Sequence, residues 1–260
     1  MRKPTKLFLT SVGVMMLLTA GLWPLSAQNA PTADRAVEKE PEAMEVLNRM
    51  GVYLRGLKAF QVDAQVTSEY VLDDGQKIQL AHKTNLLARP PDRLMVETEG
   101  DTGSQAYIYD GKTFTLFARH KGYYATATAP PTLKELVKVL DEKYDIEIPL
   151  VDLFLWGQTS NESAITKATD VGAGQVGGVS CQHYAYRQEG LDWQVWIQKG
   201  DYPLPRKIVL TTTTDEARPQ HSSILTWNLA PAYNEGAFAF EPPPGTHKIV
   251  FANDVMSARK

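Results

Sequence analysis

The feature that most constrains this fold is a switch in the spacing of apolar residues between residues 57 and 60. In residues 42–57 (EAMEVLNRMGVYLRGL), apolar side chains recur every three or four positions, which predicts an amphipathic helix. In residues 59–72 (AFQVDAQVTSEYVL), apolar and polar side chains alternate instead. Because successive side chains of a strand point to opposite faces, this second pattern predicts a long strand with one buried face.

Shorter alternating segments continue to the end of the chain and are separated by turn signals. Residues 73–75 (DDG) and 110–111 (DG) are typical of tight turns, and residues 89–93 (RPPDR) interrupt the ladder because proline has no amide hydrogen to donate. The connections are short, so the pattern predicts about a dozen mainly antiparallel strands. Beyond the first, the expected strands lie at residues 77–88, 94–98, 105–110, 113–119, 123–129, 163–171, 179–188, 192–199, 205–213, 221–230 and 245–251.

The middle of the chain predicts a helical insertion between the strands. Thr132 and Glu135 have the spacing of a capping box, in which each side chain satisfies an open amide at a helix start. The apolar stripe that follows includes Leu136 and Leu140. Pro149 fits the first turn of a second short helix (PLVDLFLWG) that is apolar nearly all round.

The N-terminal residues predict export from the cytoplasm. A basic start (MRKPTK) precedes an apolar run and a small-residue exit (SAQNA), the pattern of a secretory signal peptide with cleavage near Ala27. The apolar run is near spanning length, so retention as an anchor helix is the alternative. The only cysteine, Cys181, lies far from this site, so the sequence predicts neither lipid attachment at the signal nor an intrachain disulfide.

The charge balance argues against binding to nucleic acid. The chain has 27 Lys and Arg residues against 30 Asp and Glu residues. The signal region contains Arg2, Lys3 and Lys6 and no acids, so its removal leaves 24 bases against 30 acids, a net charge of −6. An acidic protein is poorly suited to phosphate backbones or to an anionic membrane surface.

The sequence predicts one folded domain. Residues 1–27 form the expected signal peptide, and residues 28–41 form a polar, flexible lead-in. Residues 42–252 form the domain, because no Gly-, Ser- or Pro-rich linker divides them, and residues 253–260 form a C-terminal tail.

No motif in the sequence predicts catalysis, a metal site or a cofactor. Residues 172–177 (GAGQVG) match the dinucleotide-binding glycine pattern, but a strand pattern rather than a helix follows them, which favours a glycine-rich hairpin. The five histidines are scattered, without the spacing of metal ligands. Cys181 is expected to be a small buried apolar group rather than a nucleophile.

Several phrases occur in an order that resembles a known superfamily. These are residues 86–97 (LLARPPDRLMVE), 107–117 (YIYDGKTFTLF) and 196–210 (WIQKGDYPLPRKIVL), which follow the N-terminal helix and long strand. The order resembles the periplasmic lipoprotein-carrier (LolA/LolB-like) superfamily, and in particular a family of predicted periplasmic proteins of unknown function within it. The resemblance extends from about Glu42 to Phe251.

The resemblance implies a mainly β (α+β) fold in the periplasm. A strongly curved antiparallel sheet of about a dozen strands would form an incomplete half-barrel, covered by the N-terminal helix and the central helical insertion. Related domains carry lipoprotein acyl chains, or sense lipids and envelope stress. The resemblance implies no catalytic residue and no cofactor, and no position here matches the carrier's functional arginine.

An imperfectly covered concave sheet face would leave an apolar pocket for acyl chains or similar ligands. Trp193 shares a strand face with Val195 and Ile197 and is expected to point into this pocket, whereas Trp196 lies on the opposite face. The strand residues predicted to line the pocket are Phe60, Val62, Val66, Tyr70, Leu94, Val96, Trp193, Val195, Ile197, Leu225 and Trp227. The residues predicted to cover it from the helices are Met50, Leu54, Leu136, Leu140, Phe154 and Trp156.

The sequence therefore favours a non-enzymatic binding protein, a carrier or receptor for a lipid, an acyl chain or a lipoprotein. The alternative is a sensor or scaffold domain that binds another envelope protein, and a hydrolase is the third hypothesis. The expected partners are a hydrophobic small molecule or an acylated protein. We expect no nucleic acid, no stable membrane span after signal cleavage, and a monomer.

Overall fold

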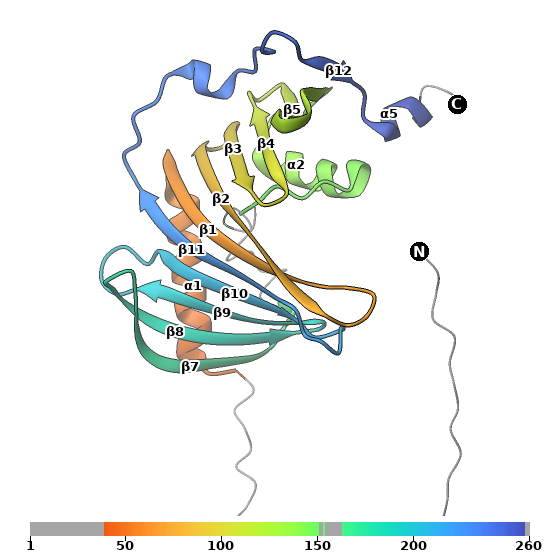
Figure 1. The fold of residues 1–260 in the computed structure, drawn as a ribbon. Helices are drawn as coiled ribbons and strands as arrows, with labels where there is room; N and C mark the ends of the chain where they lie inside the picture. The colour runs from red at the N-terminus through yellow and green to blue at the C-terminus, as the bar shows by residue number, and fades with distance from the viewer. Residues whose placement is uncertain (1–38, 151–152, 154–162, 258–260) are drawn as a thin grey trace, which may run out of the picture. The chain divides into compact units, whose positions relative to one another are not determined.

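The structure is a computed structural model that describes residues 39–150, 153 and 163–257. In this part of the chain, twelve strands form one sheet in the order β12-β6-β5-β4-β3-β2-β1-β11-β10-β9-β8-β7 (Figure 1). The sheet is curved and its two edge strands, β12 and β7, do not pair with each other. The predicted fold class, a mainly β open half-barrel with helices at the start and in the middle, is confirmed.

Strand β1 (Phe60–Val71) lies at the centre and joins the two halves of the sheet. It pairs antiparallel with β2 (Lys77–Arg89) on one side and with β11 (Gln220–Asn228) on the other, so residues more than 150 positions apart become neighbours, such as Ser68 and His221. One half of the sheet continues from β2 as a meander of β3 (Arg93–Gly100), β4 (Gly103–Tyr109), β5 (Thr113–Ala118) and β6 (Tyr123–Thr128).

The other half is a second antiparallel meander that ends beside β1. Its strands are β7 (Ile165–Val176), β8 (Val179–Gln188), β9 (Leu191–Gln198) and β10 (Pro205–Thr212). The glycine-rich residues 172–177 lie in β7 and in its turn to β8, where Gly177 and Gly178 adopt positive φ angles of 55° and 79°. The interpretation of this motif as a hairpin is therefore confirmed. Among the described strands, the one parallel pair is β6 with β12 (His247–Ile249), and an isolated parallel bridge also joins Lys39 to Ala168 on β7.

Helix α1 (Pro41–Gly56) covers the half of the sheet that contains β7 to β11 (Figure 1). Pro41 opens the first turn, where its missing amide hydrogen costs nothing. The predicted apolar stripe is buried at Ala43, Val46, Met50 and Leu54. The hydroxyl of Tyr186 on β8 donates a hydrogen bond to the carbonyl oxygen of Ala43 at 2.8 Å, which ties the helix start to the sheet.

The central insertion begins with helix α2 (Leu133–Val139) and continues as a π-helical turn, η2 (Leu140–Tyr144). The hydroxyl oxygen of Thr132 accepts a hydrogen bond from the amide of Glu135 at 3.3 Å, as the capping box predicts. The Glu135 carboxylate accepts from the Thr132 hydroxyl at 2.8 Å, where the sequence predicts a bond to an open amide. The described part also contains the short helices η1 (Arg119–Lys121), η3 (Glu235–Phe238) and α5 (Ala252–Ser257).

The core lies between the concave face of the sheet and the two helices. Strand β1 contributes Phe60, Val62, Ala64 and Val66, the alternate residues that the sequence pattern predicts to face inward. Burial of such side chains, each stabilising by about 1.5–3 kcal/mol, fixes which face of every strand points inward. None of the described helices is long and apolar enough to cross a membrane.

Candidate functional site

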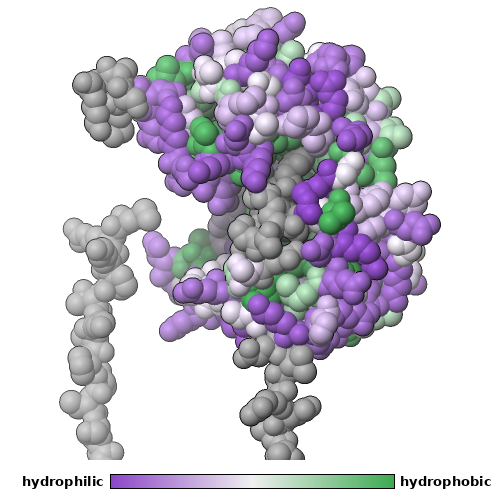
Figure 2. Space-filling view, turned by 180° about the vertical axis from the view of Figure 1, so that it is seen from behind, coloured by the Kyte–Doolittle hydropathy of each residue, from purple (hydrophilic) through white to green (hydrophobic). Residues whose placement is uncertain are grey.

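A cavity of about 1160 Å³ lies between the sheet and the central insertion. Its sheet side comes from β1, β2, β10 and β11, and its other side comes from α2, η2 and residues 146–150. We call it the insertion cavity. Figure 2 shows the molecule from behind, where the described residues present a mostly hydrophilic face with a few hydrophobic residues exposed on it. Ligand pockets in proteins span roughly 300–1,000 Å³, so the insertion cavity is large enough to hold a small molecule.

The walls of the insertion cavity are mainly apolar. Val66 on β1 and Leu210 on β10 contribute from the sheet, and Leu140 and Ile148 contribute from the insertion. Val66, Leu140 and Ile148 are 1–3% exposed, whereas Leu210 is half-buried. Displacement of water from such apolar walls by an apolar ligand lowers the free energy and therefore favours binding.

A group of polar side chains interrupts the apolar sheet face at the cavity. Ser68 (β1), His82 (β2) and His221 (β11) line the cavity, and Ser223 lies two residues beyond His221 on the same strand face. We call these four residues the polar cluster. The strand register brings them together, because Ser68 pairs with His221, and Val66 pairs with both His82 and Ser223.

Hydrogen bonds join three members of the polar cluster into a chain. The hydroxyl of Ser68 lies 2.8 Å from Nδ1 of His221, and the hydroxyl of Ser223 lies 3.2 Å from Nε2 of the same ring. In the neutral imidazole one nitrogen donates and the other accepts, so the chain can run in either direction. Ser223 is 2% exposed, which places one end of this chain in the core.

Both histidines of the polar cluster favour the neutral form. Burial lowers the pKa of His221, and repulsion from a protonated His82 lowers it further. Burial also lowers the pKa of His82, against a smaller opposing effect of the Asp101 carboxylate. Both effects follow from the cost of charge in an apolar site. At neutral pH the cluster therefore provides uncharged donors and acceptors.

Charged side chains surround the mouth of the insertion cavity on the helical side. Lys134 and Lys138 on α2 are exposed, as are three acidic residues, so neither sign of charge dominates. The acidic residues are Glu135, Asp141 and Glu147.

Three of the residues predicted to form the pocket line the insertion cavity. They are Val66, Tyr70 and Leu140, and Tyr70 is 50% exposed near the end of β1. Phe154 and Trp156 lie outside the residues that the structure describes. The other predicted residues pack in the common core. Trp227 is half-buried there. The fully packed ones are Phe60, Val62, Leu94, Val96, Trp193, Val195, Ile197, Leu225, Met50, Leu54 and Leu136.

The two tryptophans of β9 lie on opposite faces, as the alternation predicts. Trp193 is 8% exposed and stacks on Tyr186 with ring centroids 4.2 Å apart. Trp196 is half-buried on the other face, where it stacks on His183 at 3.8 Å and receives the ammonium of Lys207 at 4.8 Å from its ring. Trp193 therefore fills the core with an aromatic pair, and it does not line the insertion cavity.

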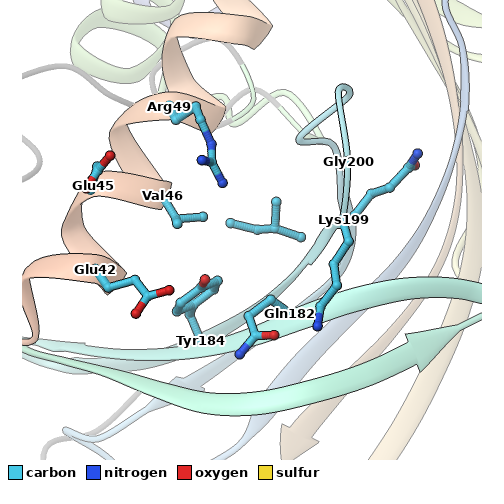
Figure 3. Close-up of a pocket in the computed structure, with 10 residues that line it drawn as sticks. Glu42, Glu45, Val46, Arg49, Gln182, Tyr184, Lys199 and Gly200 are labelled. Atoms are coloured by element: carbon cyan, nitrogen blue, oxygen red, sulfur yellow. The ribbon is translucent and has the colours of Figure 1, made fainter.

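A second cavity, of about 550 Å³, lies beside helix α1 (Figure 3). We call it the α1 cavity. Val46 and Arg49 point from the helix toward the strands, where Tyr184 and Lys199 lie (Figure 3). Glu42, Glu45 and Gln182 are also among its lining residues, so this cavity is polar. Ile197 is the only predicted pocket residue that lines it among the described residues.

The hydrolase hypothesis requires a nucleophile and a base, and Ser68 with His221 has that pairing. The second ring nitrogen of His221 contacts the Ser223 hydroxyl, and in the described part no carboxylate hydrogen-bonds to this ring. Cys181 is fully buried, and burial raises the pKa of its thiol, which opposes formation of a reactive thiolate. Among the described residues, no group of three His, Cys, Asp or Glu side chains could hold a metal ion.

Comparison with protein families and solved structures gives one extensive sequence match and several distant structural ones. The family model described as "Predicted periplasmic protein (DUF2092)" matches residues 43–252. LprF from Mycobacterium bovis is 13% identical, with 75% of this chain and 96% of that chain covered and a TM-score of 0.42.

Two further solved structures have lower scores. The lipoprotein LppX from Mycobacterium tuberculosis is 9% identical, with 75% and 98% of the two chains covered and a TM-score of 0.40. The LolA superfamily protein NE2245 from Nitrosomonas europaea is 9% identical, with 76% and 97% covered and a TM-score of 0.36. No curated protein matches the sequence.

Proposed function

We propose that this chain, which belongs to the family of predicted periplasmic proteins designated DUF2092, binds a hydrophobic ligand in the insertion cavity. The family that the sequence resembles is thus confirmed, and with it the periplasmic location. The ligand is a lipid, an acyl chain or the acyl group of a lipoprotein, and the protein acts as its carrier or receptor. The domain limits of residues 42–252 and the signal cleavage near Ala27 remain part of this proposal.

The observation that carries the proposal is the apolar lining of a cavity with room for an acyl chain. Transfer of each methylene group from water into such a site contributes about 0.8 kcal/mol. The contacts come from both the sheet and the insertion, through Val66, Leu210, Leu140 and Ile148. An acyl chain held between the sheet and the insertion would lose most of its exposed surface, which supports a binding function.

Uptake of a neutral fluorescent probe tests the proposal. We expect the delipidated, refolded protein to bind N-phenyl-1-naphthylamine at a saturable site. The variant Leu210→Trp places an indole in the cavity, and we expect it to weaken probe binding at least about tenfold, or about 1.4 kcal/mol. Val137 on α2 is half-buried and lines the same cavity, so Val137→Trp should weaken probe binding to the same extent.

The matched control is Ile224→Trp. Ile224 lies on the opposite face of β11 and is 42% exposed, so the same indole there should leave probe binding unchanged. Urea unfolding of all variants shows which of them keep the native fold. Absence of probe uptake by the unmodified protein, or equal uptake by folded Leu210→Trp and Ile224→Trp proteins, would contradict the proposed function.

A further inference from the structure

We infer that the polar cluster binds the carboxylate head group of a single-chain fatty acid whose alkyl chain occupies the insertion cavity. This inference rests on the proposed function and names the ligand class. The polar cluster occupies a sheet face that is otherwise mainly apolar, and three of its four members line the cavity. Ser223 is buried, whereas Ser68, His82 and His221 are half-buried where they line the cavity.

The hydrogen-bond chain through His221 can present a donor to the cavity. When the Ser223 hydroxyl donates to Nε2, the protonated Nδ1 donates to Ser68, and the Ser68 hydroxyl is then free to donate onward. Ser68 lines the cavity, whereas Ser223 is buried behind it. The order of the three residues therefore allows one outward-facing donor at Ser68.

His82 provides a second donor from the neighbouring strand. It lines the same cavity, and no hydrogen bond joins its ring to another described residue. His82 and Ser68 flank Val66, since Val66 pairs with His82 and Ser68 lies two residues further on the same face of β1. Two donors on adjacent strands match the two oxygen atoms of one carboxylate.

A third observation shows that this region of the sheet has unmet polar capacity. Thr84 lies two residues from His82 on the same face of β2 and is 2% exposed. Its hydroxyl is buried and has no hydrogen-bond partner among the described residues. An unpaired buried hydroxyl costs roughly 1–3 kcal/mol. Thr84 is not among the residues that line the insertion cavity, so its hydroxyl neighbours the polar cluster and is not one of the proposed ligand contacts.

A carboxylate fits the electrostatics of the cluster better than a cationic or uncharged head group. Burial disfavours the protonated forms of both histidines, and a carboxylate beside them would stabilise those forms, which neither a cationic nor an uncharged head group does. The charged groups that face the site are Asp101 beside His82, and Lys134, Glu135, Lys138, Asp141 and Glu147 on the insertion. None of these replaces the donors on the sheet, because the insertion residues are exposed at the mouth.

Competition among three ligands with the same alkyl chain tests the head-group assignment. Dodecanoic acid, methyl dodecanoate and 1-dodecanol are each titrated against bound N-phenyl-1-naphthylamine, which has no acidic group. We expect the acid to displace the probe at a concentration about tenfold lower than the ester or the alcohol, as charge-assisted hydrogen bonds imply. The variants His82→Phe and Ser68→Ala should each remove most of this preference while the alcohol still binds.

The control variant is His247→Phe, since His247 is exposed on β12 and lies outside the insertion cavity. It should keep the full preference for the acid. If His82→Phe does not fold, Ser68→Ala alone decides the assignment, because it removes only one oxygen atom.

The outcomes separate this inference from the proposed function. Equal displacement by all three ligands in the unmodified protein would overturn the head-group assignment and leave the binding function standing. Failure of all three to bind, with no uptake of the probe, would instead remove the proposed function. Mass spectrometry of the recovered methyl dodecanoate should show it unchanged, and its conversion to dodecanoate would reassign Ser68 and His221 as catalytic residues.

Discussion

The insertion cavity and the α1 cavity lie under two different covers of the same sheet. Helix α1 is 16 residues long and buries six of them against the half of the sheet that it covers, and the cavity that remains beside it is polar. Helix α2 has seven residues, buries Leu133 and Leu136, and gives way to a π-helical turn. A short, irregular cover cannot repeat the close packing of a long amphipathic helix, which is why an apolar cavity remains beneath it.

The largest expected effect comes from damage to the well-packed cover. Met50 on α1 is fully buried, and Met50→Ala should lower the free energy of unfolding by about 2–5 kcal/mol. Urea denaturation measures this loss. Val52→Ala is the control, since Val52 lies on the same helix and is 56% exposed.

Probe binding by the same variant distinguishes the role of helix α1 from that of the central insertion. Below the urea transition, folded Met50→Ala protein should still take up N-phenyl-1-naphthylamine with unchanged affinity, because the insertion cavity is intact. A stability loss no larger than that of Val52→Ala would show that α1 is not the rigid cover described here.

A smaller effect is expected from pH, and it acts through the insertion cavity. His221 has a lowered pKa in the folded protein, so the unfolded chain binds more protons below pH of about 6.5. The stability from this residue is therefore present above that pH and is lost as the pH falls through the lowered folded pKa. Urea midpoints measured from pH 7.5 to pH 5.5 should decrease.

The variant His221→Asn should flatten this decrease, whatever its absolute stability. Some pH dependence should remain, because burial also lowers the pKa values of His82 and His183. The exposed His247→Asn variant should retain the full slope. A slope in His221→Asn as steep as in the unmodified protein would contradict the burial of a neutral imidazole at the cavity.

The sheet could be predicted from the sequence because the alternation of apolar and polar residues within each strand indicates which of its faces is buried. Phe60, Val62 and Val66 alternate with polar residues in a single segment, and this local pattern predicted the inward face of β1. The family resemblance added the open, curved form of the sheet, which alternation alone does not specify. The capping box at Thr132 likewise placed the start of α2 within one residue.

The polar cluster could not be predicted in the same way. Ser68, His82 and His221 meet only through the pairing of β1 with β2 and β11, and strand register over such separations is not visible in one sequence. A weaker signal was present, since His221 and Ser223 share the inward face of β11 with the buried Leu225. The sequence pattern also could not separate Val66, which lines the cavity, from Val62, which packs in the core.

The most direct test of the central claim is mass spectrometry of the protein purified from its native periplasm without detergent. Under native conditions we predict a second mass species, heavier than the polypeptide by one acyl-chain ligand, and organic extraction should release a fatty acid from it. The Leu210→Trp variant prepared in parallel should have only the polypeptide mass. A single species at the polypeptide mass for the unmodified protein, with no extractable lipid, would contradict the claim that the insertion cavity holds a hydrophobic ligand.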